Sequence, residues 1–98
     1  MSNLTNDMKY RSRIDIVAQM LEAANNGGAT KSKIMYKAFL SYGQLKDYLT
    51  IMNEKGLLDY DKKEQLYRTT EKGRKLLKLC NKIEHFTHEQ EVAELPRM

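Results

Sequence analysis

The chain has 98 residues, of which 41% are hydrophobic and 31% charged, a length typical of one small domain. It contains no apolar run of about 18 residues, so no transmembrane helix and no membrane association are expected. The first residues lack the basic and apolar regions of a secretory signal, and the single cysteine, Cys80, cannot form an internal disulfide. These features predict a cytoplasmic protein in a reducing environment.

Basic and acidic residues are unevenly distributed around a formal net charge of +4. Up to Ile83 there are 16 basic and nine acidic residues, a net charge of +7, whereas from Glu84 onward Arg97 stands against four glutamates, a net charge of −3. A basic body favours a polyanion as partner, and a solvated surface of mixed charge is the alternative.

The chain begins with residues 1–9, which are polar and aperiodic and predict a flexible arm. Ser12 is a suitable N-cap for a first helix, with Asp15 three residues later in its first turn. Residues 25–28, Asn-Asn-Gly-Gly, end this helix because Asn and Gly accept a left-handed conformation. The apolar stripe expected to face the core is Ile14, Val17, Ala18, Leu21 and Ala24, with Ile16 and Met20 on a neighbouring face.

Two further helices are predicted, separated by an apolar bend at residues 39–40. Thr30 is the N-cap of the first, which has a short apolar face. Ser41 begins the second, where Gln44 three positions on completes a capping box, and Gly56 ends it. Its inward stripe is predicted to be Leu45, Leu49 and Met52.

The hydrophobic period then changes from that of a helix to that of a strand. Residues 57–60 and 65–69 predict a β-hairpin around a charged turn at residues 61–64. Thr70 caps a last helix over residues 71–88, and an acidic, disordered tail is expected over residues 89–98. Four apolar residues of this helix have the 3, 4, 3 spacing of a coiled-coil seam and predict a homodimer: Leu76, Leu79, Ile83 and Phe86.

This order of elements predicts a fold that is mainly α with a small β-hairpin. A helix-turn-helix followed at once by a hairpin is a winged helix-turn-helix, here over residues 10–70, with a C-terminal dimerisation helix.

Five stretches carry a family resemblance: residues 11–17 (RSRIDIV), 28–36 (GATKSKIMY), 45–49 (LKDYL), 55–58 (KGLL) and 67–73 (YRTTEKG). Over residues 9–83 the chain resembles predicted archaeal transcriptional regulators of winged helix-turn-helix type. These are related to archaeal DNA-binding proteins that dimerise through an antiparallel coiled coil of the last helix. The resemblance implies double-stranded DNA as partner and a homodimeric assembly.

A helix-turn-helix inserts its second helix into the major groove, with N-terminal residues facing base edges. The amide of Gln44 can read adenine, or it can serve only the capping box. Asp47 repels phosphate, although a carboxylate can accept from cytosine. The candidates for DNA contact on this helix are Ser41, Tyr42, Gln44 and Lys46.

Phosphate contacts are predicted from three other segments, and an ordinary solvated surface is the alternative for each. The start of the second helix contributes Lys31, Ser32 and Lys33, where backbone N–H groups and lysines suit an anion. The other candidates are Lys62, Lys63 and Arg68 of the hairpin and Arg11 and Arg13 before the first helix.

The remaining polar and aromatic residues suggest structural roles. Basic residues of the last helix are interpreted as the solvated outside of a coiled coil rather than as DNA contacts. Cys80, Glu84 and His88 share one helix face but cannot complete a tetrahedral metal site, so no metal and no cofactor are expected. Four tyrosines fall on apolar stripes or their margins and are expected in the core rather than in a base-stacking platform: Tyr36, Tyr48, Tyr60 and Tyr67.

The sequence therefore favours a dimeric, DNA-binding transcriptional regulator and not an enzyme, because no nucleophile with its base and no glycine-rich phosphate loop is present. A winged helix that binds proteins instead of DNA, or an architectural chromatin protein of low sequence specificity, is the alternative.

Overall fold

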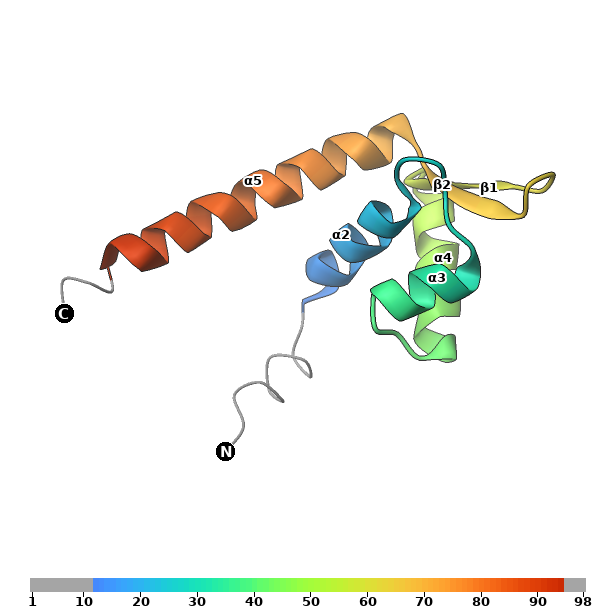
Figure 1. Cartoon of the computed structure of the whole chain (residues 1–98), viewed down its shortest axis with the longest axis horizontal. Helices are drawn as coiled ribbons and strands as arrows, with labels where there is room; N and C mark the ends of the chain where they lie inside the picture. The colour runs from blue at the N-terminus through green and yellow to red at the C-terminus, as the bar shows by residue number, and fades with distance from the viewer. Residues whose placement is uncertain (1–11, 95–98) are drawn as a thin grey trace.

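The computed structural model describes the backbone of residues 12–94 and the side chains of residues 12–82. Four helices and one hairpin follow one another in this part of the chain (Figure 1). In chain order they are α2 (Arg13–Ala24), α3 (Lys31–Lys37), α4 (Tyr42–Glu54), β1 (Leu58–Asp61), β2 (Leu66–Thr69) and α5 (Glu71–Glu94). The predicted winged helix of mixed α and β structure is confirmed.

The helix starts lie where the capping residues predict them. Ser12 and Ser41 each form a full capping box, the first with Asp15 and the second with Gln44. The Thr30 side chain accepts from the backbone N–H of Lys33 at 3.1 Å. Because capping satisfies N–H groups that a helix leaves unpaired, these short polar residues determine where α2, α3 and α4 begin.

The core lies where α2, α3, α4 and the hairpin meet. Its largest fully buried side chains are Met20, Leu21, Ile34, Leu45, Met52 and Leu58. The predicted stripe of α2 was wrong at its first position, since Ile14 is 49% exposed while Ile16 is buried. Both faces of α2 are apolar at this end, and the buried residues Ile16, Met20, Leu21 and Ala24 come from both of them.

The hairpin is antiparallel, with Leu58 paired to Thr69 and Asp61 to Leu66. Its first strand begins and ends one residue later than predicted, which brings Asp61 into the strand. Ala29 forms an isolated antiparallel bridge with Tyr67, with both backbone hydrogen bonds at 2.8 Å. The connection between α2 and α3 is therefore attached to the hairpin as a short third strand.

Helix α5 packs on the domain through its first turns only and then extends away from it (Figure 1). Leu77, which the sequence placed beside the seam, is buried, whereas Leu76 is half-buried and Leu79 is 53% exposed. The helix continues to Glu94, beyond the predicted end at residue 88. Residues 89–94 are therefore helical, where an irregular segment was predicted. None of the described helices is long and apolar enough to cross a bilayer.

The expectation that four tyrosines lie in the core is wrong for two of them. Tyr36 is 78% exposed and Tyr60 is 44% exposed. Tyr48 and Tyr67 are partly buried against the core, and the Tyr67 ring lies 4.7 Å from that of Tyr60. Phe39, in the turn between α3 and α4, is 64% exposed and has a left-handed backbone with φ of 54°.

Candidate nucleic-acid interface

Helix α4 presents a polar face to solvent opposite its buried residues Leu45, Leu49 and Met52. Tyr42, Lys46 and Thr50 follow at intervals of four residues and therefore lie on one side of the helix. All three are exposed, and the Lys46 Nζ lies 5.8 Å from the centre of the Tyr42 ring. Asn53, which the sequence analysis did not single out, is exposed three residues further along the same side.

Gln44 is committed to the start of this helix. Its side-chain Oε1 accepts from the Ser41 backbone N–H at 3.0 Å, and its backbone N–H donates to the Ser41 Oγ at 3.2 Å. A bidentate contact to adenine needs both the oxygen and the nitrogen of the amide. With the capping box intact, one lone pair of Oε1 is already used, whereas the side chains of Tyr42 and Lys46 are exposed along the outer side of the helix.

Asp47 and Ile51 belong to the other side of α4, which borders an apolar groove. The groove has a volume of about 700 Å³ and runs between α2 and α4 beneath the start of α5. Ile14, Val17, Ile51 and Leu76 supply its apolar lining, and Arg13 lies at its edge. Arg13 is thus exposed next to an apolar surface. Arg11 lies outside the described residues.

The first turn of α3 carries three exposed polar side chains, Lys31, Ser32 and Lys33. No carboxylate is present in this turn, so the two lysines add positive charge to the N-terminal end of the helix. Such an arrangement attracts anions.

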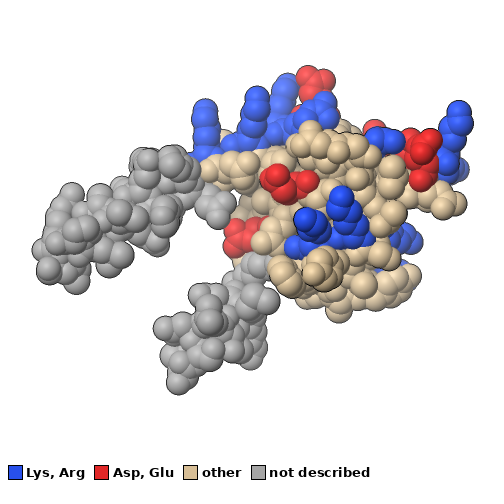
Figure 2. Space-filling model, in the orientation of Figure 1, with Lys and Arg blue, Asp and Glu red and all other residues tan. Residues whose placement is uncertain are grey.

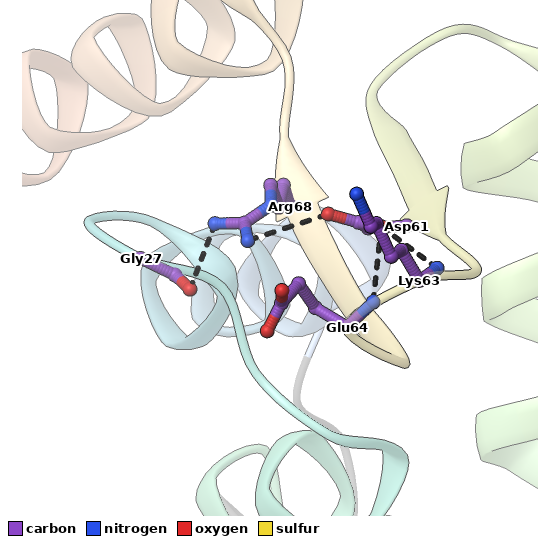
Figure 3. A network of polar contacts seen from close by, with 5 residues as sticks. All are labelled: Gly27, Asp61, Lys63, Glu64 and Arg68. Atoms are coloured by element: carbon purple, nitrogen blue, oxygen red, sulfur yellow. Dashed lines mark hydrogen bonds and ion pairs between the residues drawn. The ribbon is translucent and has the colours of Figure 1, made fainter.

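The wing tip presents Lys62 and Lys63, both exposed, on a turn that Asp61 organises. The Asp61 Oδ1 accepts from the backbone N–H groups of Lys63 at 3.0 Å and of Glu64 at 3.1 Å (Figure 3). These hydrogen bonds, that of Glu64 foremost, lower the pKa of Asp61 below its ordinary value, and the Arg68 guanidinium adds to the effect. The ionised carboxylate is therefore favoured, and it accepts both backbone hydrogen bonds of the tip.

Arg68 uses its guanidinium inside the protein. Nη1 donates to the Gly27 carbonyl at 2.9 Å, and Nη2 donates to the Asp61 Oδ2 at 3.4 Å (Figure 3). The side chain is 42% exposed, and two of its donors are already engaged. The sequence analysis placed Arg68 among the phosphate contacts and missed these partners, because one is a backbone carbonyl 41 residues away.

A second set of basic side chains lies along α5. Figure 2 shows Lys and Arg in a row along the edge of this helix. Lys75, Lys78 and Lys82 are exposed, while Lys72 donates to the Lys55 carbonyl at 2.8 Å and Arg74 to the Thr69 carbonyl at 3.1 Å. These residues lie on a different element from α3, α4 and the wing, although Lys72 reaches the end of α4 through its hydrogen bond to Lys55.

The predicted dimerisation residues are only partly described. Leu76 packs against the core, and Leu79 is half exposed on the part of α5 that leaves the domain. The side chains of Ile83 and Phe86 lie outside the described residues.

The fold and this arrangement match a known class. The model of the family described as winged helix-turn-helix matches residues 10–88, so the chain belongs to the winged helix-turn-helix family. Among solved structures, the chain is similar to the crystal structure of Sso10a-2, a DNA-binding protein from Sulfolobus solfataricus. The two are 21% identical with a TM-score of 0.65, and the match covers 90% of this chain and 99% of the other. No curated protein matches this chain in sequence.

Proposed function

We propose that this protein binds duplex DNA as a dimeric transcriptional regulator, with α4 in the major groove and the wing on the phosphate backbone. The observation that carries the proposal is the polar, exposed stripe of α4 together with exposed lysines on α3 and on the wing. Helix-turn-helix proteins read base edges with the second helix and take up phosphates with flanking elements. DNA binding by the similar Sulfolobus protein supports the same role here.

The proposed phosphate contacts come from Lys31 and Lys33 of α3 and from Lys62 and Lys63 of the wing. Tyr42 and Lys46 of α4 are the proposed contacts to bases. Ser32 and Ser41 are proposed as further contacts to the DNA phosphate backbone. Arg11 and Arg13 are secondary candidates because they precede or begin α2. Such a regulator would act in the cytoplasm, at the nucleoid.

Dimerisation is proposed through α5. Residues 71–82 of this helix carry five basic residues and one acidic residue, whereas residues 83–94 carry four glutamates and no Lys or Arg. Two copies that pair in antiparallel orientation would place the basic half of one helix against the acidic half of the other. Leu79, which is 53% exposed on the monomer, would be covered by that pairing.

The test is a titration of labelled duplex DNA repeated at several salt concentrations. Four to six cationic contacts per subunit, about eight to twelve per dimer, predict that the logarithm of the affinity falls with the logarithm of salt at a slope of about −7 to −11. Lys31→Ala removes two contacts from a dimer and should reduce the steepness by about 2 on every sequence, whereas the matched control Lys78→Ala on α5 should leave it unchanged. A nearly flat salt dependence would contradict the proposal.

A protein-binding winged helix is the second candidate, and a specific observation favours it. The groove between α2 and α4 exposes Ile14 and Ile51 at 49% and 43%. Asp47 beside this groove opposes a DNA phosphate but does not oppose a protein partner. Ile51→Glu would abolish binding of such a partner, while a DNA-binding protein would retain its salt-dependent binding. Equal affinity for all duplex sequences would instead support the architectural role.

A further inference from the structure

Arg68 joins two segments that are far apart in the chain. Gly27, whose carbonyl accepts from Nη1 at 2.9 Å, lies in the turn that leads into α3. Asp61, whose Oδ2 accepts from Nη2 at 3.4 Å, is the last residue of β1 and adjoins the wing tip (Figure 3). A single guanidinium therefore connects the start of the helix-turn-helix to the wing.

The backbone around this contact is closely packed. Gly28 has a φ of 89°, and a Cβ on it would lie 3.0 Å from the Tyr67 carbonyl oxygen and 3.2 Å from the Arg68 Cγ. Only glycine combines this conformation with this approach. The bridge between Ala29 and Tyr67 fixes the middle of β2 here, and the Arg68 side chain reaches past it to Asp61, the last residue of β1 before the tip.

Asp61 connects Arg68 to the wing tip. While Oδ2 accepts from Arg68, Oδ1 accepts from the N–H groups of Lys63 and Glu64. The carboxylate is a bidentate acceptor between the guanidinium and the turn that carries the exposed lysines. Movement of Arg68 would therefore change the position of the turn.

We infer that Arg68 and Asp61 are positioning residues that set the spacing between the wing lysines and the lysines of α3 for contact with successive phosphates of one duplex. The inference rests on the proposed DNA binding. Phosphates of a duplex have a regular spacing, so the two lysine pairs both bind only when their separation matches that spacing. Arg68 affects DNA binding indirectly, because it positions the wing. Asp61 favours DNA binding by the same route, although its own negative charge repels phosphate.

The direction in which Asp61→Asn changes the affinity for DNA tests this inference. Asparagine keeps an oxygen for the tip N–H groups but replaces the acceptor of Arg68 with an amide. Removal of a negative charge from a DNA-facing wing would strengthen binding if electrostatics alone operated. Positioning instead predicts a loss of affinity, by about 2- to 5-fold given the partial exposure of the ion pair. Tighter binding by Asp61→Asn would overturn the inference.

Substitutions of Arg68 provide an independent test. Arg68→Lys retains the charge but loses the planar fork that reaches two acceptors. If Arg68 contacted phosphate directly, Arg68→Lys would keep most of the affinity, and Arg68→Gln would add its effect to that of Asp61→Asn. If Arg68 is a positioning residue, Arg68→Lys loses affinity, and the double variant of Asp61→Asn with Arg68→Gln binds no more weakly than either single variant.

Amide hydrogen exchange of the full chain without DNA separates this inference from the proposed function. Exchange at Lys63 and Glu64 should accelerate in Arg68→Gln, and the control Lys62→Ala should leave it unchanged. Unchanged exchange in Arg68→Gln would overturn the connection between Arg68 and the tip. An unsubstituted protein that shows no salt-dependent DNA binding would overturn the proposed function, whatever the exchange experiment shows.

Discussion

The hydroxyl of Thr69 donates to the backbone carbonyl of Leu21 at 2.7 Å in the interior of the domain. This carbonyl belongs to the last turn of α2, and the N–H four residues later, that of Asn25, donates to Glu22 instead. Thr69 is only 5% exposed and ends β2. The hydrogen bond therefore satisfies a helix-end carbonyl and at the same time attaches the wing to α2.

Replacement of this threonine should be costly. Thr69→Val leaves the Leu21 carbonyl buried without its donor, and the free energy of unfolding should fall by about 1–3 kcal/mol. Thr69→Ser keeps the hydroxyl and is the matched control, with a smaller loss from the missing methyl group. Urea unfolding of the three proteins measures the difference. Equal stability of the valine and serine variants would contradict this account.

Two glycines in helices should respond in opposite directions to alanine. A Cβ on Gly73 would clash with the Leu57 carbonyl oxygen and lie 2.8 Å from the Thr69 Cγ2, whereas a Cβ on Gly43 meets nothing within 4 Å. Gly73→Ala should destabilise the protein by about 1–3 kcal/mol because the site is already filled. Gly43→Ala should stabilise it by up to about 1 kcal/mol, since alanine is the better helix former. Thermal unfolding distinguishes the two.

Gln44 should behave as a capping residue. Gln44→Ala should lower stability by up to about 1 kcal/mol and weaken binding to a preferred site and to random DNA alike. Gln44→Glu keeps the capping acceptor, so its stability should remain close to that of the unsubstituted protein. Paired measurements of unfolding and of affinity for both DNAs check this. Loss of affinity confined to the preferred site, with stability retained, would show that Gln44 reads a base.

The assembly should depend on the outer part of α5. Leu79→Lys combined with Ile83→Lys should give a folded monomer, because Leu79 makes little contribution to the core. Leu77→Ala is the control, since Leu77 is 6% exposed and its loss should reduce stability by about 2–5 kcal/mol without changing the assembly. Sedimentation provides the measurement. An unsubstituted protein that is monomeric at high micromolar concentration would rule out the α5 dimer.

The ion pair and tip hydrogen bonds of Asp61 should contribute to stability only above acid pH. The folded-state pKa of Asp61 is lowered, so its contribution is fully present above the unfolded pKa of about 3.9 and is lost as pH falls through the folded value. The difference in stability between the unsubstituted protein and Asp61→Asn should be constant from about pH 5 to 8 and should shrink below about pH 4. Denaturant unfolding at each pH measures it, and a difference that changes near neutrality would point to another group.

Local signals predicted most of the fold. Capping by Ser12, Thr30 and Ser41 depends on residues three positions apart, so the helix starts could be found without knowledge of the tertiary structure. The burial of Ile16 rather than Ile14 on α2 could not be found, because both residues are apolar and only tertiary packing selects between them. The wing strands were found to within one residue because their period differs from that of the helices.

The candidate site was less predictable for a physical reason. The spacing of apolar and polar residues predicts which side chains of α3, α4 and the wing are exposed. Tyr42, Lys31 and Lys62 are exposed, as a DNA-facing role requires. The partners of Arg68 could not be inferred, since a backbone carbonyl such as that of Gly27 has no sequence signature. Tyr36 also misled the analysis, because a tyrosine beside a short apolar face carries no sign of which way it points.

The close approach of Gly73 to Leu57 also determines the direction in which α5 leaves the domain. A helix of 24 residues is about 36 Å long, so a rotation of about 10° at its first turn moves its far end by about 6 Å. That displacement approaches the rise of two base pairs, at about 3.4 Å each. In an α5-linked dimer, a change of side-chain volume at position 73 would alter the span between the two DNA-binding heads without altering any residue that faces DNA. Relatives could thus differ in the distance between the two DNA sites that a dimer binds because of a substitution in the interior of the domain alone.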